Sequence, residues 1–310
     1  MTSVKIEAPA TVANLVCGFD VLGMALNDPQ DIMELQLTDE PGIRIRHTDG
    51  YDLPTAPAQN VAGAGLIALM QEYSDKSIGF DLVVNKCIKP GSGLGSSAAS
   101  SAGAVVAANH LLNNFFSKED LVRFAMNGEK LASGVKHADN IAPCIYGGVT
   151  LIRSIFPLDI IQLSAPPMFV TVVHPQIEVK TSDARQILRK EVLLKDAIKQ
   201  WGNIAGLVAG FMKNDYELIS RSLEDVIIEP VRSILIPGFD EVKRKSKEAG
   251  AMGGGISGSG PSIFMLSKEA NTARQIEALM SEVFKGLGID YKTYVTTLNN
   301  TGVKITAQTA

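Results

Sequence analysis

The chain has 310 residues, which is too long for one small hydrophobic core and fits two domains of roughly 150 residues each. Hydrophobic residues make up 45% and charged residues 20%, a composition typical of a globular protein that argues against disorder or a fibre. The net charge is -4 and no five like charges occur in a row, so a nucleic-acid-binding surface is not expected.

The first half of the sequence mixes strand and helix patterns. Alternating apolar residues predict one strand at residues 4–8, ended by Pro9, and a second at 31–37. A third strand at 43–46 is predicted to pair with the second as a hairpin. The remaining predicted elements are helices at 60–73, 96–112 and 118–133 and strands at 80–84 and 147–152.

Three prolines interrupt the pattern between residues 155 and 167, and we place the domain boundary there, with domains at 1–160 and 161–310. Strands and helices alternate irregularly beyond it. This mixture favours an α+β fold over a doubly wound sheet. The predicted elements are strands at 168–173, 262–266 and 292–297 and helices at 195–212, 216–222, 239–249 and 269–285.

A segment rich in glycine and serine lies between a predicted strand and a predicted helix. Glycine permits positive φ and close backbone approach, and the first turn of a helix offers unpaired N–H groups to an anion. The segment therefore predicts a phosphate-binding loop, although a tight turn before a small-residue helix would look the same. It consists of Pro90, Gly91, Ser92, Gly93, Leu94, Gly95, Ser96 and Ser97.

Two better-known nucleotide loops are excluded. No lysine follows Gly95, as a Walker loop requires. A G-x-G-x-x-G spacing occurs at residues 253–258, but a helix pattern precedes it and a strand follows, the reverse of the required order. This second glycine-rich segment, which extends to Pro261, is interpreted as a hairpin-like turn or as a brace for the first loop.

Further candidate site residues are polar side chains outside the glycine loop. A carboxylate can hold Mg²⁺ on a phosphate chain, and arginine suits a carboxylate or phosphate. Each residue also has an ordinary structural explanation, as a solvated side chain, a turn cap or a hydrogen-bonded loop residue. They are Asn14 and Asp20 after the first strand, Glu129 in a helix, His137 to Asn140 after it, and Arg185 and Arg232 in the second half.

The cysteines and the N-terminal residues indicate the cellular compartment in which the protein is expected to act. Cys17, Cys87 and Cys144 are odd in number and far apart, which argues against a disulfide framework or a zinc site and for a reducing compartment. The N-terminus lacks an apolar signal core, and the longest uncharged stretch, residues 90–116, is too rich in Gly, Ser and Asn to span a membrane. We expect a cytoplasmic protein that binds neither nucleic acid nor membrane.

Taken together, these segments resemble the GHMP kinase superfamily and, within it, the homoserine kinase family. Three superfamily motifs occur in order, at residues 8–23, 90–100 and 254–262. The resemblance to the narrower family rests on residues 18–23, 128–140, 181–185 and 229–239, and it covers nearly the whole chain.

The resemblance implies a two-domain fold, with an N-terminal domain like domain 2 of ribosomal protein S5 and a ferredoxin-like C-terminal domain. It implies transfer of the γ-phosphoryl group of ATP to the side-chain hydroxyl of L-homoserine, in threonine biosynthesis, and often a homodimer. Alternatives are a related kinase acting on mevalonate or shikimate, or an inactive regulator of the same fold.

The resemblance also implies roles for particular residues. Ser97 and Glu129 match magnesium ligands, and Asn60 and Lys86 match positions near the nucleotide. The homoserine pocket is matched by Asn14, Asp20, His137, Asn140, Thr181, Arg185 and Arg232.

The expected chemistry is consistent with those roles, because two arginines suit the carboxylate of an amino acid and Asp20 suits its ammonium group. Asn140 stands where related mevalonate kinases have a proposed aspartate base, and an amide cannot take a proton. We therefore expect no carboxylate base, with the proton passing to a phosphate oxygen. A large loss of rate in Asp139→Asn, with substrate binding intact, would contradict this expectation.

Overall fold

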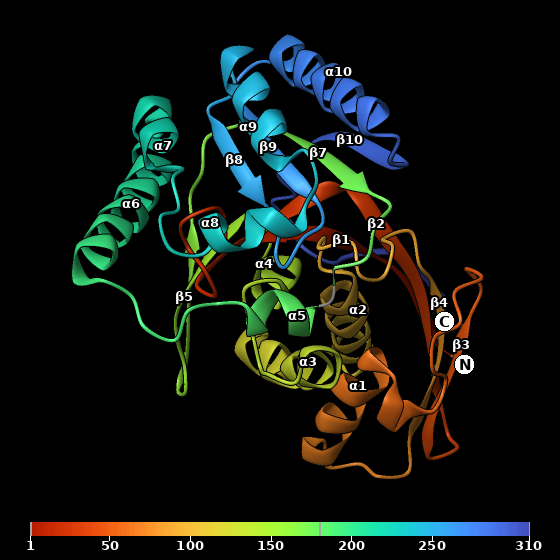
Figure 1. Ribbon diagram of the computed structural model, residues 1–310. Helices are drawn as coiled ribbons and strands as arrows, with labels where there is room; N and C mark the ends of the chain where they lie inside the picture. The colour runs from red at the N-terminus through yellow and green to blue at the C-terminus, as the bar shows by residue number, and fades with distance from the viewer. Residues whose placement is uncertain (1, 180, 310) are drawn as a thin grey trace.

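The computed structural model describes residues 2–179 and 181–309, and the side chains of Thr181 and Ser182 lie outside its description. The described chain forms two sheets, each covered by helices (Figure 1). The first has the strand order β11-β1-β2-β4-β3, with β5 paired to β2 and β6 paired to β5. Its strands are β1 (Ser3–Ala13), β2 (Leu22–Thr38), β3 (Gly42–His47), β4 (Gly79–Asn85), β5 (Val149–Ile155), β6 (Leu158–Leu163) and β11 (Lys304–Thr309).

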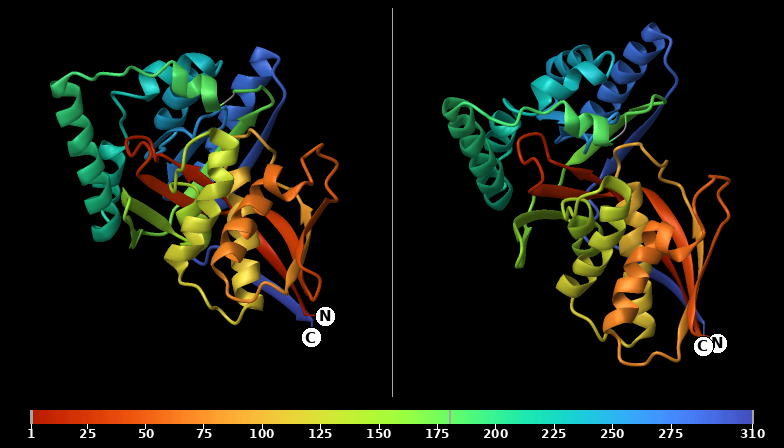
Figure 2. Two further views of the ribbon diagram at one scale, coloured as in Figure 1. Left: turned by 90° about the horizontal axis from the view of Figure 1, so that it is seen from below. Right: turned by 60° about the horizontal axis from the view of Figure 1, so that its bottom comes forward.

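Helices α1 to α3 pack together against one face of this sheet, and the two chain ends lie side by side at its edge (Figure 2). The small residues of α2 allow close packing, because a Cβ on Gly103 would lie only 1.9 Å from the Met33 side chain of β2. Side chains between sheet and helices form the main hydrophobic core. The helices are η1 (Pro57–Gln59), α1 (Val61–Glu72), α2 (Ser96–Leu111), α3 (Lys118–Ser133) and α4 (Ile141–Tyr146).

The second sheet has the antiparallel order β10-β7-β9-β8. Helices α9 and α10 cover it, and α6 and α7 form a helical hairpin at the side of the molecule (Figure 1). The strands are β7 (Phe169–Pro175), β8 (Gly253–Ile256), β9 (Ile263–Ser267) and β10 (Tyr291–Thr297). The helices are α5 (Thr181–Gln186), α6 (Leu194–Lys213), α7 (Tyr216–Ser222), α8 (Glu229–Arg232), η2 (Ser233–Leu235), α9 (Phe239–Glu248) and α10 (Ala270–Leu287).

Two strand predictions are wrong. β1 does not end at Pro9, because the register of β1 against β2 shifts between Pro9 and Thr11 and a strand tolerates proline at such an irregularity. β3 is not a hairpin partner of β2, since β1 and β4 already flank β2. Instead β3 pairs in parallel with β4, and α1 lies on the connection between them, as a parallel crossover requires.

The glycine-rich segment at residues 253–261 is only partly a turn. Gly253–Ile256 forms strand β8, and the turn begins at Ser257. Glycine is required in this strand because a Cβ on Gly254 would lie 2.0 Å from the Phe264 carbonyl oxygen of β9. The expected α+β fold class is confirmed, since the described strands form two sheets and helices pack against each of them.

We expected the domain boundary between residues 160 and 161. Two strands of the first sheet do not fit a division of the chain at that point. β6 crosses that point as the second strand of the β5-β6 hairpin, and β11 returns from the end of the chain to pair antiparallel with β1. Among the described residues, no helix combines the length and apolar character needed to cross a membrane.

Candidate active site

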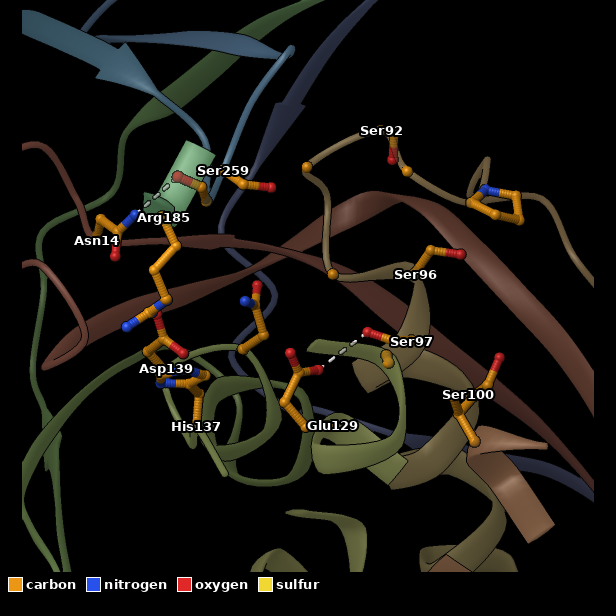
Figure 3. Close-up of a pocket in the computed structure, with 18 of the residues that line it drawn as sticks. Asn14, Ser92, Ser96, Ser97, Ser100, Glu129, His137, Asp139, Arg185 and Ser259 are labelled. Atoms are coloured by element: carbon orange, nitrogen blue, oxygen red, sulfur yellow. Dashed lines mark hydrogen bonds between the residues drawn. The ribbon is translucent and has the colours of Figure 1, made fainter. Parts of the chain in front are cut away.

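A cavity of about 350 Å³ lies where loops of the two halves meet. Its wall includes the glycine loop, the residues after β1, the end of α3, the start of α4, and residues of α5, α8 and the β8-β9 turn (Figure 3). The sequence-predicted residues on this wall are Asn14, Asp20, Lys86, Pro90, Gly91, Ser92, Gly93, Gly95, Ser96, Ser97, Glu129, His137, Asn140, Arg185 and Arg232.

The glycine loop needs its glycines for conformation and for space. Gly91, Gly93 and Gly95 have φ values of 74°, 79° and 66°. A Cβ on Gly95 would lie 1.9 Å from the Thr11 hydroxyl, so only glycine fits there. Gly95 is the N-cap of α2 and no side chain caps this helix. The first turn of α2 therefore offers its N–H groups and its positive dipole end to an anion.

Both halves of the molecule hold this loop in place. From β1, the Thr11 N–H donates to the Leu94 carbonyl at 3.1 Å. From the β8-β9 turn, the Ser257 hydroxyl donates to the Gly93 carbonyl at 2.7 Å, and the Ser262 N–H donates to the Ser92 carbonyl at 3.3 Å. The second glycine-rich segment therefore does brace the first.

Lys86 supports the start of α2 from beneath. Its ammonium group pairs with the buried Asp31 carboxylate and donates to the Ser96 carbonyl and to the Ser100 hydroxyl, each at 2.8 Å. Because Asp31 neutralises Lys86 inside the protein, this lysine acts first as a support for the loop.

Ser97 on α2 and Glu129 on α3 point toward each other across the cavity (Figure 3). The Ser97 hydroxyl donates to Glu129 Oε2 at 3.0 Å. Two oxygen donors at this spacing fit Mg²⁺, which takes few ligands from protein and the rest from phosphate and water. The described residues hold no group of three or more His, Cys, Asp or Glu that could bind a metal without a ligand's help.

The other end of the cavity carries opposite charges. The Arg185 guanidinium donates to both carboxylate oxygens of Asp20, at 2.9 and 3.2 Å. The ring of Phe19 lies below both arginines, 5.4 Å from the Arg185 guanidinium carbon and 4.9 Å from that of Arg232. Such cation–π contacts hold the two like charges near one another.

Arg232 is buried and fixed by backbone groups. Its Nε donates to the Ala184 carbonyl at 2.9 Å, and another nitrogen donates to the Gly258 carbonyl at 3.2 Å. Burial, with help from neighbouring Arg185, lowers the pKa of Arg232 to about 10, so it stays charged at neutral pH. A buried cation with these hydrogen bonds to backbone carbonyls can still accept an anion as partner.

Asn14 fixes the backbone that carries Asp20. The Asn14 Oδ1 accepts from the Asp20 N–H at 3.1 Å, and its amide nitrogen donates to the Gly258 carbonyl at 2.9 Å. Both residues have positive φ, 72° and 61°, which asparagine and aspartate tolerate better than most residues. Asn14 thus shapes the charged end of the cavity and links it to the β8-β9 turn.

The segment before α4 contributes three neighbouring polar residues. His137 Nδ1 lies 3.6 Å from Asp20 Oδ1, and burial lowers the His137 pKa. Burial, with the nearby Asp20 and Glu129 charges, raises the pKa of Asp139 to about 8. Asn140 Oδ1 accepts from the Thr11 hydroxyl at 2.7 Å.

Three predicted site residues do not lie on the wall of the cavity. Leu94 is buried beneath the glycine loop. Asn60 is the N-cap of α1, where its side chain accepts from the Ala62 and Gly63 N–H groups, and the neighbouring Val61 lines the cavity instead. Thr181 begins α5, but its side chain lies outside the described part of the chain.

The structure adds site residues that the sequence reasoning passed over. Thr11 and Phe19 lie within the first motif. Their residue types alone do not indicate a role in the site, because that role depends on which distant residues the fold brings next to them. Ser259 lies in the second glycine-rich segment, and Leu53 is in an irregular loop whose position only the fold reveals.

Comparisons with known proteins agree with this geometry. The model of the GHMP kinase N-terminal domain matches residues 60–148, and that of the GHMP kinase C-terminal domain matches residues 207–286. The chain therefore belongs to the GHMP kinase family, a class of enzymes that this fold and glycine loop define.

Within that family, relatives that are 40–46% identical over most of the chain are homoserine kinases. The chain is 46% identical over 290 residues to the homoserine kinase of Chloroherpeton thalassium, covering 90% of this chain and 91% of that one. It is 45% identical to the enzyme of Chlorobium phaeobacteroides, covering 92% of each. A solved homoserine kinase structure from Cytophaga hutchinsonii superposes with a TM-score of 0.94 at 47% identity, covering 98% and 97%.

Proposed function

We propose that this protein catalyses ATP-dependent phosphorylation of the side-chain hydroxyl of L-homoserine, giving O-phospho-L-homoserine for threonine biosynthesis. The observation that carries the proposal is the division of one cavity into a glycine loop at one end and an Asp20, Arg185 and Arg232 cluster at the other. This arrangement suits a reaction between ATP and a small zwitterion.

The charged end is complementary to the α-ammonium and α-carboxylate groups of an amino acid. In the structure the Asp20 carboxylate and the Arg185 guanidinium pair with each other. A zwitterion can serve both residues at once, because its ammonium group pairs with Asp20 and its carboxylate pairs with Arg185 and Arg232. A neutral or purely anionic alcohol leaves Asp20 without a cation.

The phosphate end positions the triphosphate and neutralises its charge, which phosphoryl transfer requires more than covalent catalysis. The loop amides and the first turn of α2 bind phosphate oxygens, and the Ser97 and Glu129 oxygens hold Mg²⁺. When bound, Mg²⁺ neutralises charge on the transferring phosphoryl group. Lys86 does not serve the loop as a Walker lysine does, since it is paired with Asp31 beneath the loop.

Neither Asn140 nor Asp139 supplies a carboxylate base for the acceptor hydroxyl. The Asn140 oxygen already accepts from Thr11, so its NH₂ group is the part left to donate toward substrate. Burial raises the pKa of the Asp139 carboxyl to about 8, so at neutral pH it holds its proton and is a poor proton acceptor. The hydroxyl proton therefore passes to a phosphate oxygen.

The expected location and binding partners are part of the same proposal. The protein acts in the cytoplasm, on homoserine and ATP, without a nucleic-acid or membrane partner. The absence of long like-charge runs supports the expectation that the protein does not bind nucleic acid.

A coupled assay of the purified protein with ATP, Mg²⁺ and a panel of hydroxylated metabolites tests the proposal. Turnover of L-homoserine is expected, with little turnover of mevalonate or shikimate. Turnover of mevalonate but not homoserine would overturn the substrate assignment. ATP binding without any turnover would favour an inactive regulator.

A further inference from the structure

Helix α6 carries a buried polar side chain that the active site does not explain. Among the buried residues that the structure describes in α6, which are Ala197, Gln200, Leu207, Gly210 and Phe211, only Gln200 is polar. Its relative exposure is 5%, and it does not line the cavity. A buried amide is costly unless its donor and acceptor atoms are satisfied, so the partners of Gln200 indicate why it is there.

Gln200 joins two segments that lie far apart in the chain. Its side-chain nitrogen donates to the Cys17 carbonyl at 2.8 Å, in the loop between β1 and β2. Its side-chain oxygen accepts from the Val226 N–H at 3.1 Å, in the connection between α7 and α8. Asp20 follows three residues after Cys17, and Arg232 follows six residues after Val226. One amide therefore links the segment of the site carboxylate with the segment of the buried guanidinium.

The loop between β1 and β2 has a backbone that needs support from outside. Asn14, Leu15 and Val16 have successive φ values of 72°, 41° and 67°. This left-handed conformation is costly for leucine and for β-branched valine, and it persists only where the surroundings fix it. The Cys17 carbonyl follows these three residues directly. The hydrogen bond from Gln200 is therefore one of the contacts that hold the loop in this conformation.

The segment that leads into α8 also depends on contacts from outside. α8 has four residues, too few for a helix to be stable alone. The Asp225 carboxylate supports its first turn by accepting from the Glu229 N–H at 2.9 Å. Val226 is the next residue after Asp225, so Gln200 fixes the backbone from which this carboxylate projects. A shift of that backbone would move Arg232 at the end of α8.

We propose that Gln200 is a positioning residue for the amino-acid end of the site. It sets the spacing between Asp20 and Arg232, and thereby the spacing between the partners of the substrate ammonium and carboxylate groups. The role rests on the proposed function, because that function assigns both groups to one amino acid. It does not extend to the glycine loop, which Thr11 and Ser257 hold.

Steady-state kinetics of Gln200→Met test this role. Methionine keeps the length of the side chain but supplies neither the N–H donor nor a strong acceptor. We expect the KM for homoserine to rise by about tenfold or more, because small displacements of binding groups are costly, and the KM for ATP to stay unchanged. Gln200→Asn carries an amide too short to reach both partners, and it should change the same constant in the same direction if methionine prevents folding.

Asn109→Leu is the matched control. Asn109 is also a buried amide with two hydrogen bonds to a loop, since its Nδ2 donates to the Phe116 carbonyl at 3.1 Å and its Oδ1 accepts from the Phe116 N–H at 2.8 Å. It lies in the last turn of α2 and does not line the cavity. Its replacement should lower Tm, as the loss of Gln200 does, but should leave the KM for homoserine unchanged.

Thiol labelling tests the same role without any substrate, in a Cys87→Ser background because Cys87 is the exposed native thiol. Cys17 lies in the supported loop, whereas Cys144 is buried in α4. A pulse of iodoacetamide followed by mass spectrometry measures both thiols. Gln200→Met should speed the labelling of Cys17 relative to Cys144, because local opening exposes the released loop first. Asn109→Leu should leave this ratio unchanged.

The outcomes separate the role of Gln200 from the proposed function. A wild-type protein that does not phosphorylate homoserine would contradict the proposed function, while the labelling ratio would still decide whether Gln200 holds the loop. Three results would overturn the role of Gln200: an unchanged KM for homoserine in its variants, an equal rise in the KM for ATP, or Cys17 labelling no faster than in the wild type.

Discussion

Single hydrogen bonds and charges decide what each side chain of the cavity can do. Asp20, Arg185 and Arg232 are ordinary charged residues in the sequence, but the fold places them around Phe19 with the carboxylate and one guanidinium in direct contact. Cys17 is the opposite case, since burial raises its pKa to about 12 and leaves little reactive thiolate. Its position in the loop after β1, three residues before Asp20, therefore does not make it a reactive site.

Thr11 is predicted to orient the Asn140 amide. Thr11→Val keeps the shape of the side chain but removes the hydroxyl that donates to the Asn140 oxygen. The Asn140 side-chain amide is then free to rotate. We expect kcat to fall roughly 10- to 100-fold, as misplacement of a site group does, with little change in KM for ATP. Steady-state kinetics check this result. Thr11→Ser keeps the hydroxyl and should restore most of the rate, whereas equal losses in both variants would contradict the role.

The buried Asp139 carboxyl is predicted to make stability depend on pH. Its folded pKa of about 8 lies above its ordinary value of 3.8, so the folded protein retains a proton that the unfolded chain releases. The contribution of the Asp139 carboxyl to the free energy of unfolding is fully present below about pH 4 and is lost as the pH rises toward 8. Asp139→Asn should therefore gain stability over the wild type as the pH rises, by up to a few kcal/mol.

Urea denaturation of both proteins at pH 5 and pH 8, with EDTA and without ATP, measures that difference. The same variant should retain kcat for homoserine, because the wild-type carboxyl is already protonated at neutral pH. A pH-independent difference would contradict the stability prediction, and a large loss of kcat would indicate a carboxylate role.

At the scale of elements, the glycine loop is defined by its neighbours as much as by its own residues. Its composition predicts a phosphate site at the start of a helix, and α2 begins there as expected. That Thr11 of β1 and Ser257 of the β8-β9 turn hold the loop follows only from packing between distant segments.

Gly95 and Gly91 provide a matched pair of substitutions in this loop. Both have positive φ, so alanine costs about 1–2 kcal/mol at either position. A Cβ at Gly95 would also collide with Thr11, whereas a Cβ at Gly91 meets nothing within 4 Å. Gly95→Ala should therefore abolish ATP binding or folding, while Gly91→Ala should fold with modestly weaker binding. Calorimetric ATP titration and thermal melting check both, and similar behaviour of the two variants would contradict the packing argument.

At the scale of the whole molecule, the end of the chain completes the sheet at its beginning. β11 pairs with β1 over Lys304–Thr309, so β1 is not an edge strand. The first sheet therefore contains strands from both halves of the sequence. We propose that the stability of this sheet depends on both chain ends.

Removal of residues 304–310 is predicted to expose the β1 edge. Most β11 side chains are exposed, so the loss is chiefly of backbone hydrogen bonds and edge protection. We expect Tm to fall by roughly 3–8 °C, with more aggregation on heating. Removal of residues 309 and 310 alone leaves most of the pairing with β1 and serves as the control in differential scanning calorimetry. Equal Tm values for the wild type and the longer truncation would contradict this prediction.

The sequence by itself determined most of the local elements, the glycine loop at the start of α2 and the family, because these depend on spacing and motifs within short segments. It did not predict β6, β8, β11 or the short helices α4, α5 and α8. It misplaced the partner of β3, since an alternating pattern specifies which residues share a face but not which strand lies alongside. The pairing of Asp20 with Arg185, the Thr11 contact with Asn140, the brace from Ser257 and the return of β11 were decided by the tertiary structure. Each joins segments far apart in the chain, and only the packing of the whole molecule brings such segments together.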